Sequence, residues 1–119
     1  MGLFSGLFRP SIRSLERDGN TARLADLLWE TAQKKSLSER DMKTLDKGAE
    51  ALARLARLSR DDERQKVSEV IDHVVTMEKQ GADLIQTILE FHRGGVDELR
   101  AEQLRLAGIR MHLQEALRG

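Results

Sequence analysis

The sequence DDERQKVSEVIDHVVTMEKQGADLIQTILEFH, residues 61–92, contains the longest periodic stretch of the chain. It begins with acidic residues, which favour the positively polarised first turn of a helix. Its apolar positions then follow a near-heptad spacing, at Val67, Val70 or Ile71, Val74, Met77, Gly81, Leu84, Ile88 and Phe91. A break at Gly81 would give two helices, but the spacing keeps its phase across this glycine. We therefore favour one helix over 61–92, about 48 Å long at 1.5 Å per residue, with any bend at Gly81.

Turn signals on both sides of this stretch divide the chain into further helices. Asp18-Gly19-Asn20 ends a short helix, and Gly94-Gly95 separates the long helix from the last one. Ser38-Glu39-Arg40-Asp41 approximates a capping box, with Asp41 in the place of the usual glutamate. In addition to 61–92, we therefore expect helices over 11–17, from 20 or 21 to about 32, over 38–58 and over 96–118.

The predicted fold class is all-α. We expect about five helices in one domain over 1–119, arranged as an irregular helical bundle or as a short stack of helix pairs. Short loops favour antiparallel neighbours. Residues 31–59 contain seven basic and four acidic residues (+3), and residues 60–93 contain five basic and eight acidic residues (−3), so these two segments are expected to pair side by side. Trp29, the only tryptophan, is expected in the core.

The composition argues against several classes of protein. Twenty Lys and Arg residues balance twenty Asp and Glu residues, whereas proteins that bind nucleic acid or anionic lipid usually carry excess positive charge. The absence of cysteine excludes disulfides, thiolate zinc sites and thiol nucleophiles. No apolar run approaches the roughly 18 residues of a membrane span. We expect a cytoplasmic protein that does not bind nucleic acid.

Motifs for catalysis or metal binding are also absent from the sequence. The histidines His73, His92 and His112 lie about twenty residues apart, and neither HExxH nor a phosphate-binding glycine loop occurs. Glu69 lies one helical turn from His73, and Glu115 one turn from His112, but two ligands are too few for a tight metal site. The sequence therefore predicts no enzyme activity, no metal and no cofactor.

An apolar segment over 1–10 contains two of the three phenylalanines. Leu3 and Leu7, like Phe4 and Phe8, are four residues apart, so a helical turn would bring all four to one side. Pro10 favours an extended conformation just before it, which turns the segment away from the following helix. We expect the segment to fold back on the helices as a plug, and the alternative is an anchor on a membrane surface.

The far end of the long helix is a second candidate interaction surface. The helix over 38–58 spans only about 30 Å, so the apolar positions beyond its reach need another cover. These positions are Leu84, Ile88 and Phe91. The last helix can supply part of the cover, and we expect a second copy of the chain to supply the rest in a two-fold symmetric homodimer.

The first 28 residues contain a characteristic set of apolar and turn positions. They are Met1-Gly2-Leu3-Phe4, Leu7-Phe8, Pro10, Ile12, Leu15, Gly19, Leu24 and Leu27-Leu28. This set resembles the opening of small prokaryotic HEAT-repeat proteins. Residues 58–64 resemble the acidic turn between two such repeats, and residues 97–100 resemble the start of another repeat. The resemblance implies a short HEAT-like stack of paired helices that binds other proteins on a curved face. The sequence departs from the family because it has no consistent repeat period, and the helix after Asp61 exceeds a HEAT unit in length.

The expected function is that of a non-enzymatic protein-interaction or structural module, such as a scaffold, an adaptor or a regulatory subunit. The alternative is a helical protein that lies on a membrane surface through its apolar segment over 1–10. A protein partner is expected in the first case, but no motif in the sequence identifies it.

Overall fold

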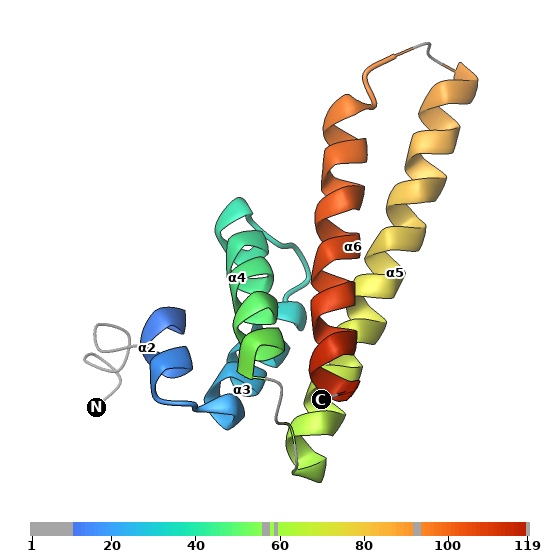
Figure 1. The fold of residues 1–119 in the computed structure, drawn as a ribbon. Coiled ribbons are helices and arrows are strands. Elements are labelled where there is room, and N and C mark those ends of the chain that lie inside the picture. The colour runs from blue at the N-terminus through green and yellow to red at the C-terminus, as the bar shows by residue number, and fades with distance from the viewer. Residues whose placement is uncertain (1–10, 56–57, 59, 92–93, 119) are drawn as a thin grey trace.

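The computed structural model of the chain describes residues 11–55, 58, 60–91 and 94–118. This part contains five α-helices and no β-strand (Figure 1), namely α2 (Ile12–Arg17), α3 (Thr21–Ala32), α4 (Glu39–Leu55), α5 (Asp61–Phe91) and α6 (Asp97–Arg118). The predicted all-α fold class is therefore confirmed. The candidate residues Leu3, Phe4, Leu7 and Phe8, and with them the expected plug, lie outside the described residues.

Side chains at the predicted positions cap the first three of these helices. Ser11 and Asn20 each accept a hydrogen bond from the backbone N–H three residues further on, at 3.0 and 3.1 Å. At the start of α4, the Ser38 hydroxyl accepts from the Asp41 N–H at 3.1 Å, and Asp41 Oδ2 accepts from the Ser38 N–H at 2.9 Å. This reciprocal pair is the capping box that the sequence predicted.

The helix α5 runs without a break through 31 residues, about 46 Å. The prediction of a single long helix is therefore confirmed. A Cβ at Gly81 would lie 2.2 Å from Gln103 Oε1 in α6. Glycine at position 81 leaves room for the Gln103 side chain of α6 and does not divide α5 into two helices.

The four longer helices form two hairpins that lie side by side. Between α3 and α5, the contacting residues are about 40 positions apart along the whole of α3: Thr21–Glu63, Asp26–Lys66, Trp29–Glu69 and Gln33–His73. A constant difference in position means that α3 and α5 are parallel. Between α5 and α6 the sum of the two residue numbers is constant instead, at 181 for both Glu78–Gln103 and Arg64–Leu117, so these helices are antiparallel.

The helices α4 and α5 occupy diagonal positions and do not contact each other within the described residues. Instead, α4 packs on α2, α3 and α6, and it runs in the same direction as α6 (Figure 1). The prediction that residues 31–59 and 60–93 pair side by side is therefore wrong. Opposite charges join the stacked hairpins in another way, for example through Arg105 in α6 and Glu39 in α4 at 2.9 Å. Apolar burial decides the arrangement, because exposed ion pairs contribute only about 0–1 kcal/mol each.

Buried apolar side chains from all five helices form one continuous core. Leu15 of α2 joins this core, and Arg54 of α4 holds α2 through Glu16, with Nη2 to Oε1 at 2.8 Å. The hydrogen bond from Arg54 lowers the pKa of the Glu16 carboxyl. The largest fully buried side chains are Leu24, Leu28, Leu45, Leu52, Val67, Val70, Val74, Ile109 and Leu113.

Trp29 packs against this core without being fully enclosed. Its indole Nε1 donates a hydrogen bond of 2.9 Å to Glu69 Oε2, which joins α3 to α5. The prediction that Trp29 lies in the core is therefore confirmed for its ring, which packs against the core. Its N–H lies at the edge of the core and donates to a polar partner there.

The helices α5 and α6 extend past α3 and α4 as a two-helix arm (Figure 1). Gln33, just after α3, contacts His73, and Glu39, the first residue of α4, pairs with Arg105. We define the arm as residues 76–91 and 94–104, which lie past these contacts. The far end of α5 thus outreaches its neighbour, as expected, but the neighbour is α3 and not the helix over 38–58.

Candidate functional site

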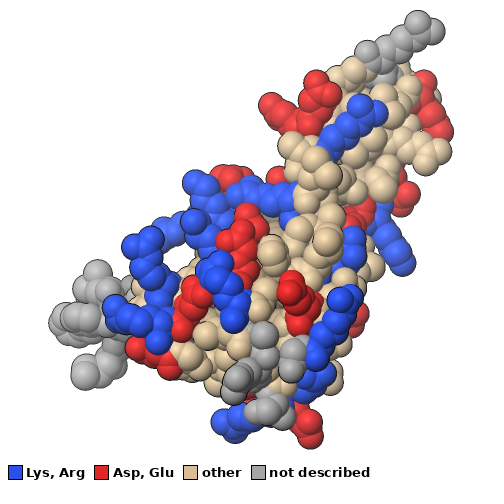
Figure 2. All heavy atoms as spheres, viewed as in Figure 1, with Lys and Arg blue, Asp and Glu red and all other residues tan. Residues whose placement is uncertain are grey.

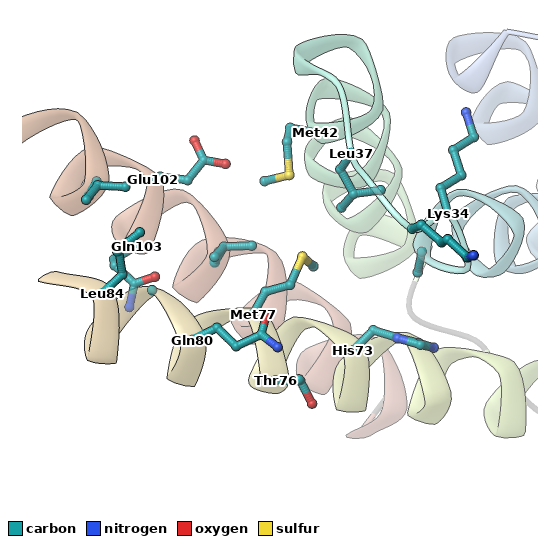
Figure 3. Close-up of a pocket in the computed structure, with 15 residues that line it drawn as sticks. Lys34, Leu37, Met42, His73, Thr76, Met77, Gln80, Leu84, Glu102 and Gln103 are labelled. Carbon is teal, nitrogen blue, oxygen red and sulfur yellow. The ribbon is translucent and has the colours of Figure 1, made fainter. Parts of the chain in front are cut away.

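An open groove lies where the arm meets the turn between α3 and α4 (Figure 3). Its volume is about 470 Å³, which falls within the usual range of ligand pockets. One wall comes from α5 and α6, and the other from the end of α3, the following turn and the start of α4. The groove is the candidate functional site.

Apolar side chains line most of the groove on both sides. They are Leu37 and Met42 on the side of α4, and Met77, Leu84, Leu99 and Leu106 on the side of the arm. On α5, positions 77, 80 and 84 continue the face that contacts α3 at residues 66, 69 and 73, because positions three or four apart share one side of a helix. Beyond His73, α3 no longer covers this face. The groove is therefore an unpartnered continuation of a helix-packing surface.

Charged and polar side chains form the rim of the groove near the α3–α4 turn. Lys34 Nζ donates to Asp41 Oδ1 at 2.8 Å. This hydrogen bond, together with that from the Ser38 N–H, lowers the pKa of Asp41 to about 2. Lys35 is exposed and forms no ion pair with any described residue. The rim therefore offers one ammonium group that is already neutralised and one that is available to a ligand.

Polar contacts between α5 and α6 fix the wall of the groove that belongs to the arm. Gln103 Nε2 donates to the Glu78 carbonyl oxygen at 2.8 Å, across the space that Gly81 leaves open. Arg110 Nε donates to Glu78 Oε1 at 2.7 Å, and this hydrogen bond raises the pKa of Arg110. The base of the arm is thereby tied together just below the groove.

The structure brings one of the predicted interaction residues into the groove and leaves the other two further along the arm. Leu84 lines the groove and is 48% exposed. Ile88 is half-buried, and Phe91, at the end of α5, is 75% exposed. The three residues share one side of α5, as the spacing predicted. Within the described residues, the prediction that this stretch lacks a full cover therefore holds for Leu84 and Phe91.

Sequence reasoning missed the other side chains of the groove. Leu37 and Met42 reach it because α3 and α5 are parallel, which brings the α3–α4 turn against the middle of α5. Met77 belongs to the apolar spacing predicted for 61–92, but no feature of the sequence indicated that it would lie in a groove. The lengths of the predicted helices gave the available signal, since a helix of 12 residues covers less than half of one of 31.

The described residues show neither a metal site nor a membrane-spanning helix. No group of three or more His, Asp or Glu side chains in this part of the chain is arranged to hold a metal ion. None of the helices described here combines the length and the apolar character needed to cross a bilayer.

Comparison with known proteins gives no relative from which a function follows. No protein-family model, no curated protein and no solved structure matches this chain. The geometry of the groove and of the helix surfaces is therefore the basis for assigning a function.

Proposed function

We propose that this protein is a non-catalytic interaction module that binds an amphipathic helix of a partner protein in the groove. The main support is that the face of α5 that packs on α3 continues past the end of α3, and no other described element covers it there. A helix in this position would extend the line of α3 and bury the same kind of surface that α3 buries. Helix-in-groove binding of this type uses apolar anchors three or four residues apart.

The dimensions of the uncovered face define the length of the ligand. From His73 to Phe91 it extends over 18 residues, about 27 Å. A partner helix of about five turns fits this length and places four or five apolar side chains against the face. The apolar lining, which includes Met42 and Met77, suits such a ligand because methionine adapts to different side-chain shapes.

The charges around the groove define the polar side of the ligand. Lys35, at the end near the α3–α4 turn, favours an acidic group. Glu98, exposed on α6, favours a basic group further along, whereas Glu102, one turn after it, already pairs with Arg105 at 3.9 Å. The partner helix is therefore expected to be acidic at one end and basic where it faces α6.

The parallel placement of the two hairpins supports a place for this module among stacked helix-pair proteins. In such stacks each hairpin packs on its neighbour, and partners bind on the concave surface that runs along the stack. We therefore propose that the chain is related to HEAT-repeat proteins. Its role would be that of a scaffold, an adaptor or a regulatory subunit.

A synthetic peptide tests the proposed function directly. The probe is a fluorescein-labelled helix of about 18 residues with leucine at every third or fourth position, glutamate at one end and arginine along the flank. Fluorescence anisotropy is expected to show saturable binding to the full chain, whereas a peptide with alanine in place of leucine is expected to bind at least about tenfold more weakly.

Two matched variants locate the binding site. Leu84→Glu is expected to weaken peptide binding at least about tenfold. Leu89→Glu is the control, because Leu89 is 44% exposed on the same helix but lies about 140° around it from Leu84. Equal effects of the two substitutions, or no saturation at about 1 mM peptide, would refute the proposed function.

A further inference from the structure

The side of α6 that faces away from the core carries a second apolar strip. Positions 97, 101, 104, 108, 111, 115 and 118 follow one another at spacings of four and three, which places them on one side of the helix. Among them, Leu104 is 76% exposed and Met111 is 61% exposed. The buried residues of α6, Leu106, Ile109, Leu113 and Ala116, form the opposite side. No described element covers Leu104 or Met111.

This strip is self-complementary when a second α6 crosses it in the antiparallel direction. With a two-fold axis near Ala107 and Gly108, opposed residue numbers sum to about 215, so Leu104 of each copy faces Met111 of the other. A Cβ at Gly108 would meet nothing within 4 Å, so the surface at the axis is open. Two helices can therefore approach closely at their centre, with the large side chains on both sides of it.

The charges at both ends of the strip have the same antiparallel complementarity. The register that opposes Leu104 and Met111 also places Arg100 beside Glu115 and Asp97 beside Arg118 of the other copy. All four side chains are exposed, and none forms an ion pair with another described residue. A parallel pair would instead set Arg100 against Arg100 and Glu115 against Glu115. The charge pattern therefore selects the antiparallel arrangement.

We propose that the outer face of α6 joins two copies of this chain in an antiparallel, two-fold symmetric dimer. Figure 2 shows mostly uncharged side chains along the projecting arm, with a basic side chain lying among them and acidic groups on both sides. The interface differs from the one expected at Leu84, Ile88 and Phe91. The α6 residues that line the groove, Leu99, Gln103 and Leu106, lie about 100–160° around the helix from Leu104. The dimer thus leaves both grooves open, and it is independent of the proposed binding function.

Sedimentation velocity tests the dimer across a range of protein concentrations, from about 10 µM to about 1 mM. The wild-type chain is expected to shift from monomer to dimer within this range. Leu104→Glu is expected to raise the dimer dissociation constant at least about tenfold. Leu89→Glu, the same substitution at an exposed leucine of α5 outside the proposed interface, is expected to leave it unchanged. Circular dichroism confirms that each variant keeps its helix content.

A charge exchange tests the register. Arg100→Glu and Glu115→Arg are each expected to weaken the dimer at least about threefold. The pair of residues 100 and 115 occurs twice in the symmetric interface, so each substitution creates two pairs of like charges. The double variant Arg100→Glu/Glu115→Arg restores both pairs and is expected to dimerise like the wild type. A monomeric wild type at about 1 mM, an unaffected Leu104→Glu variant, or a double variant as weak as the single ones would overturn the proposal.

Discussion

Asp41 has two structural tasks at the rim of the groove. Its carboxylate caps the first turn of α4 through the Ser38 N–H and holds Lys34, which lies in the turn after α3. Both partners favour the charged form, so the pKa of Asp41 is lowered from 3.8 to about 2. The ionised side chain thus stabilises the α3–α4 turn that forms one wall of the groove.

The effect of Asp41 on stability is expected to depend on pH. Because the folded-state pKa lies below the ordinary value, the stabilisation is present above about pH 4 and is lost as the pH falls through about 2. Asp41→Asn is therefore expected to lower the urea midpoint of unfolding at pH 7, and the difference from the wild type is expected to close between pH 4 and pH 2. Asp72→Asn, on an exposed position of α5, is the matched control. A difference that stays constant from pH 7 to pH 2 would contradict this role.

Residue-level features were predictable where their partners lie close in the sequence. The caps at Ser11, Asn20 and Ser38 involve backbone groups three residues away, so the local sequence determines them. The partner of Trp29, by contrast, is Glu69, 40 positions away. No local pattern predicts such a pair, because it depends on the parallel direction of α3 and α5.

Gly48 sets the distance between α3 and α4. A Cβ at this position would lie 2.5 Å from Leu28 Cδ2 and 3.2 Å from Leu28 Cγ, and Leu28 is fully buried. Alanine at 48 would therefore force Leu28 out of its place in the core. Overpacking of this kind costs about 1–3 kcal/mol, whereas the gain in helix propensity is only about 1 kcal/mol.

Gly48→Ala is expected to lower the free energy of unfolding by up to about 2 kcal/mol. Gly108→Ala is the matched change in α6, where a Cβ meets open space, and it is expected to raise this free energy by about 0.5–1 kcal/mol. Urea titrations of both variants measure these free energies, at a protein concentration low enough to keep the chain monomeric. If Gly48→Ala instead raised the free energy of unfolding, α3 and α4 could move apart without a loss of stability, and the proposed role of Gly48 would be wrong.

At the scale of elements, the sequence predicted each helix but not which helices pack together. The stop signals at Gly19 and Gly94 and the capping box at Ser38 lie within a few residues of the observed helix ends. The pairing of α4 with α5 was inferred from net charge, and that inference failed. Net charge over a segment does not say which side of a helix carries the charge, and the side decides the contact.

The molecule as a whole has a well-packed base and a sparsely packed arm. The fully buried residues of α5 and α6 lie in 67–74 and 109–116, whereas Leu84 and Leu89 in the arm are nearly half exposed. Local opening is therefore expected to be easier in the arm than in the base.

Hydrogen exchange is expected to reveal this difference. In dilute protein, backbone amides over 84–91 and 98–101 are expected to exchange at least about tenfold faster than those over 67–74 and 109–116. The leucine-containing peptide is expected to slow exchange in the arm, with a smaller effect in the base. If the amides of α5 were equally protected along its whole length in dilute protein without peptide, the division into a well-packed base and a sparsely packed arm would be wrong.

Only one wall of the groove was predictable from the sequence, because the other wall depends on how the two hairpins are placed. The excess length of α5 over its neighbours is visible in the sequence, so Leu84 and Phe91 were recognised as lacking a cover. The opposite wall at Leu37 and Met42 depends on how one hairpin lies on the other. The outer face of α6 was missed because its apolar positions are interrupted by glycine and alanine, which hide the spacing of Leu104 and Met111.

The parallel placement of the hairpins also has a consequence for the order in which the chain assembles. The contacts of α3 with α5 join residues about 40 positions apart, so α3 and α4 leave the ribosome well before the helices that complete their core. During this interval Leu24, Leu28, Leu45 and Leu52 lack their final neighbours. The contact of Arg64 Nη2 with the carbonyl oxygen of Leu117 joins the first turn of α5 to the end of α6, so it can form only after the whole of α6 has been synthesised. A nascent chain without α6 is therefore expected to expose the surfaces of α4 and α5 on which α6 packs.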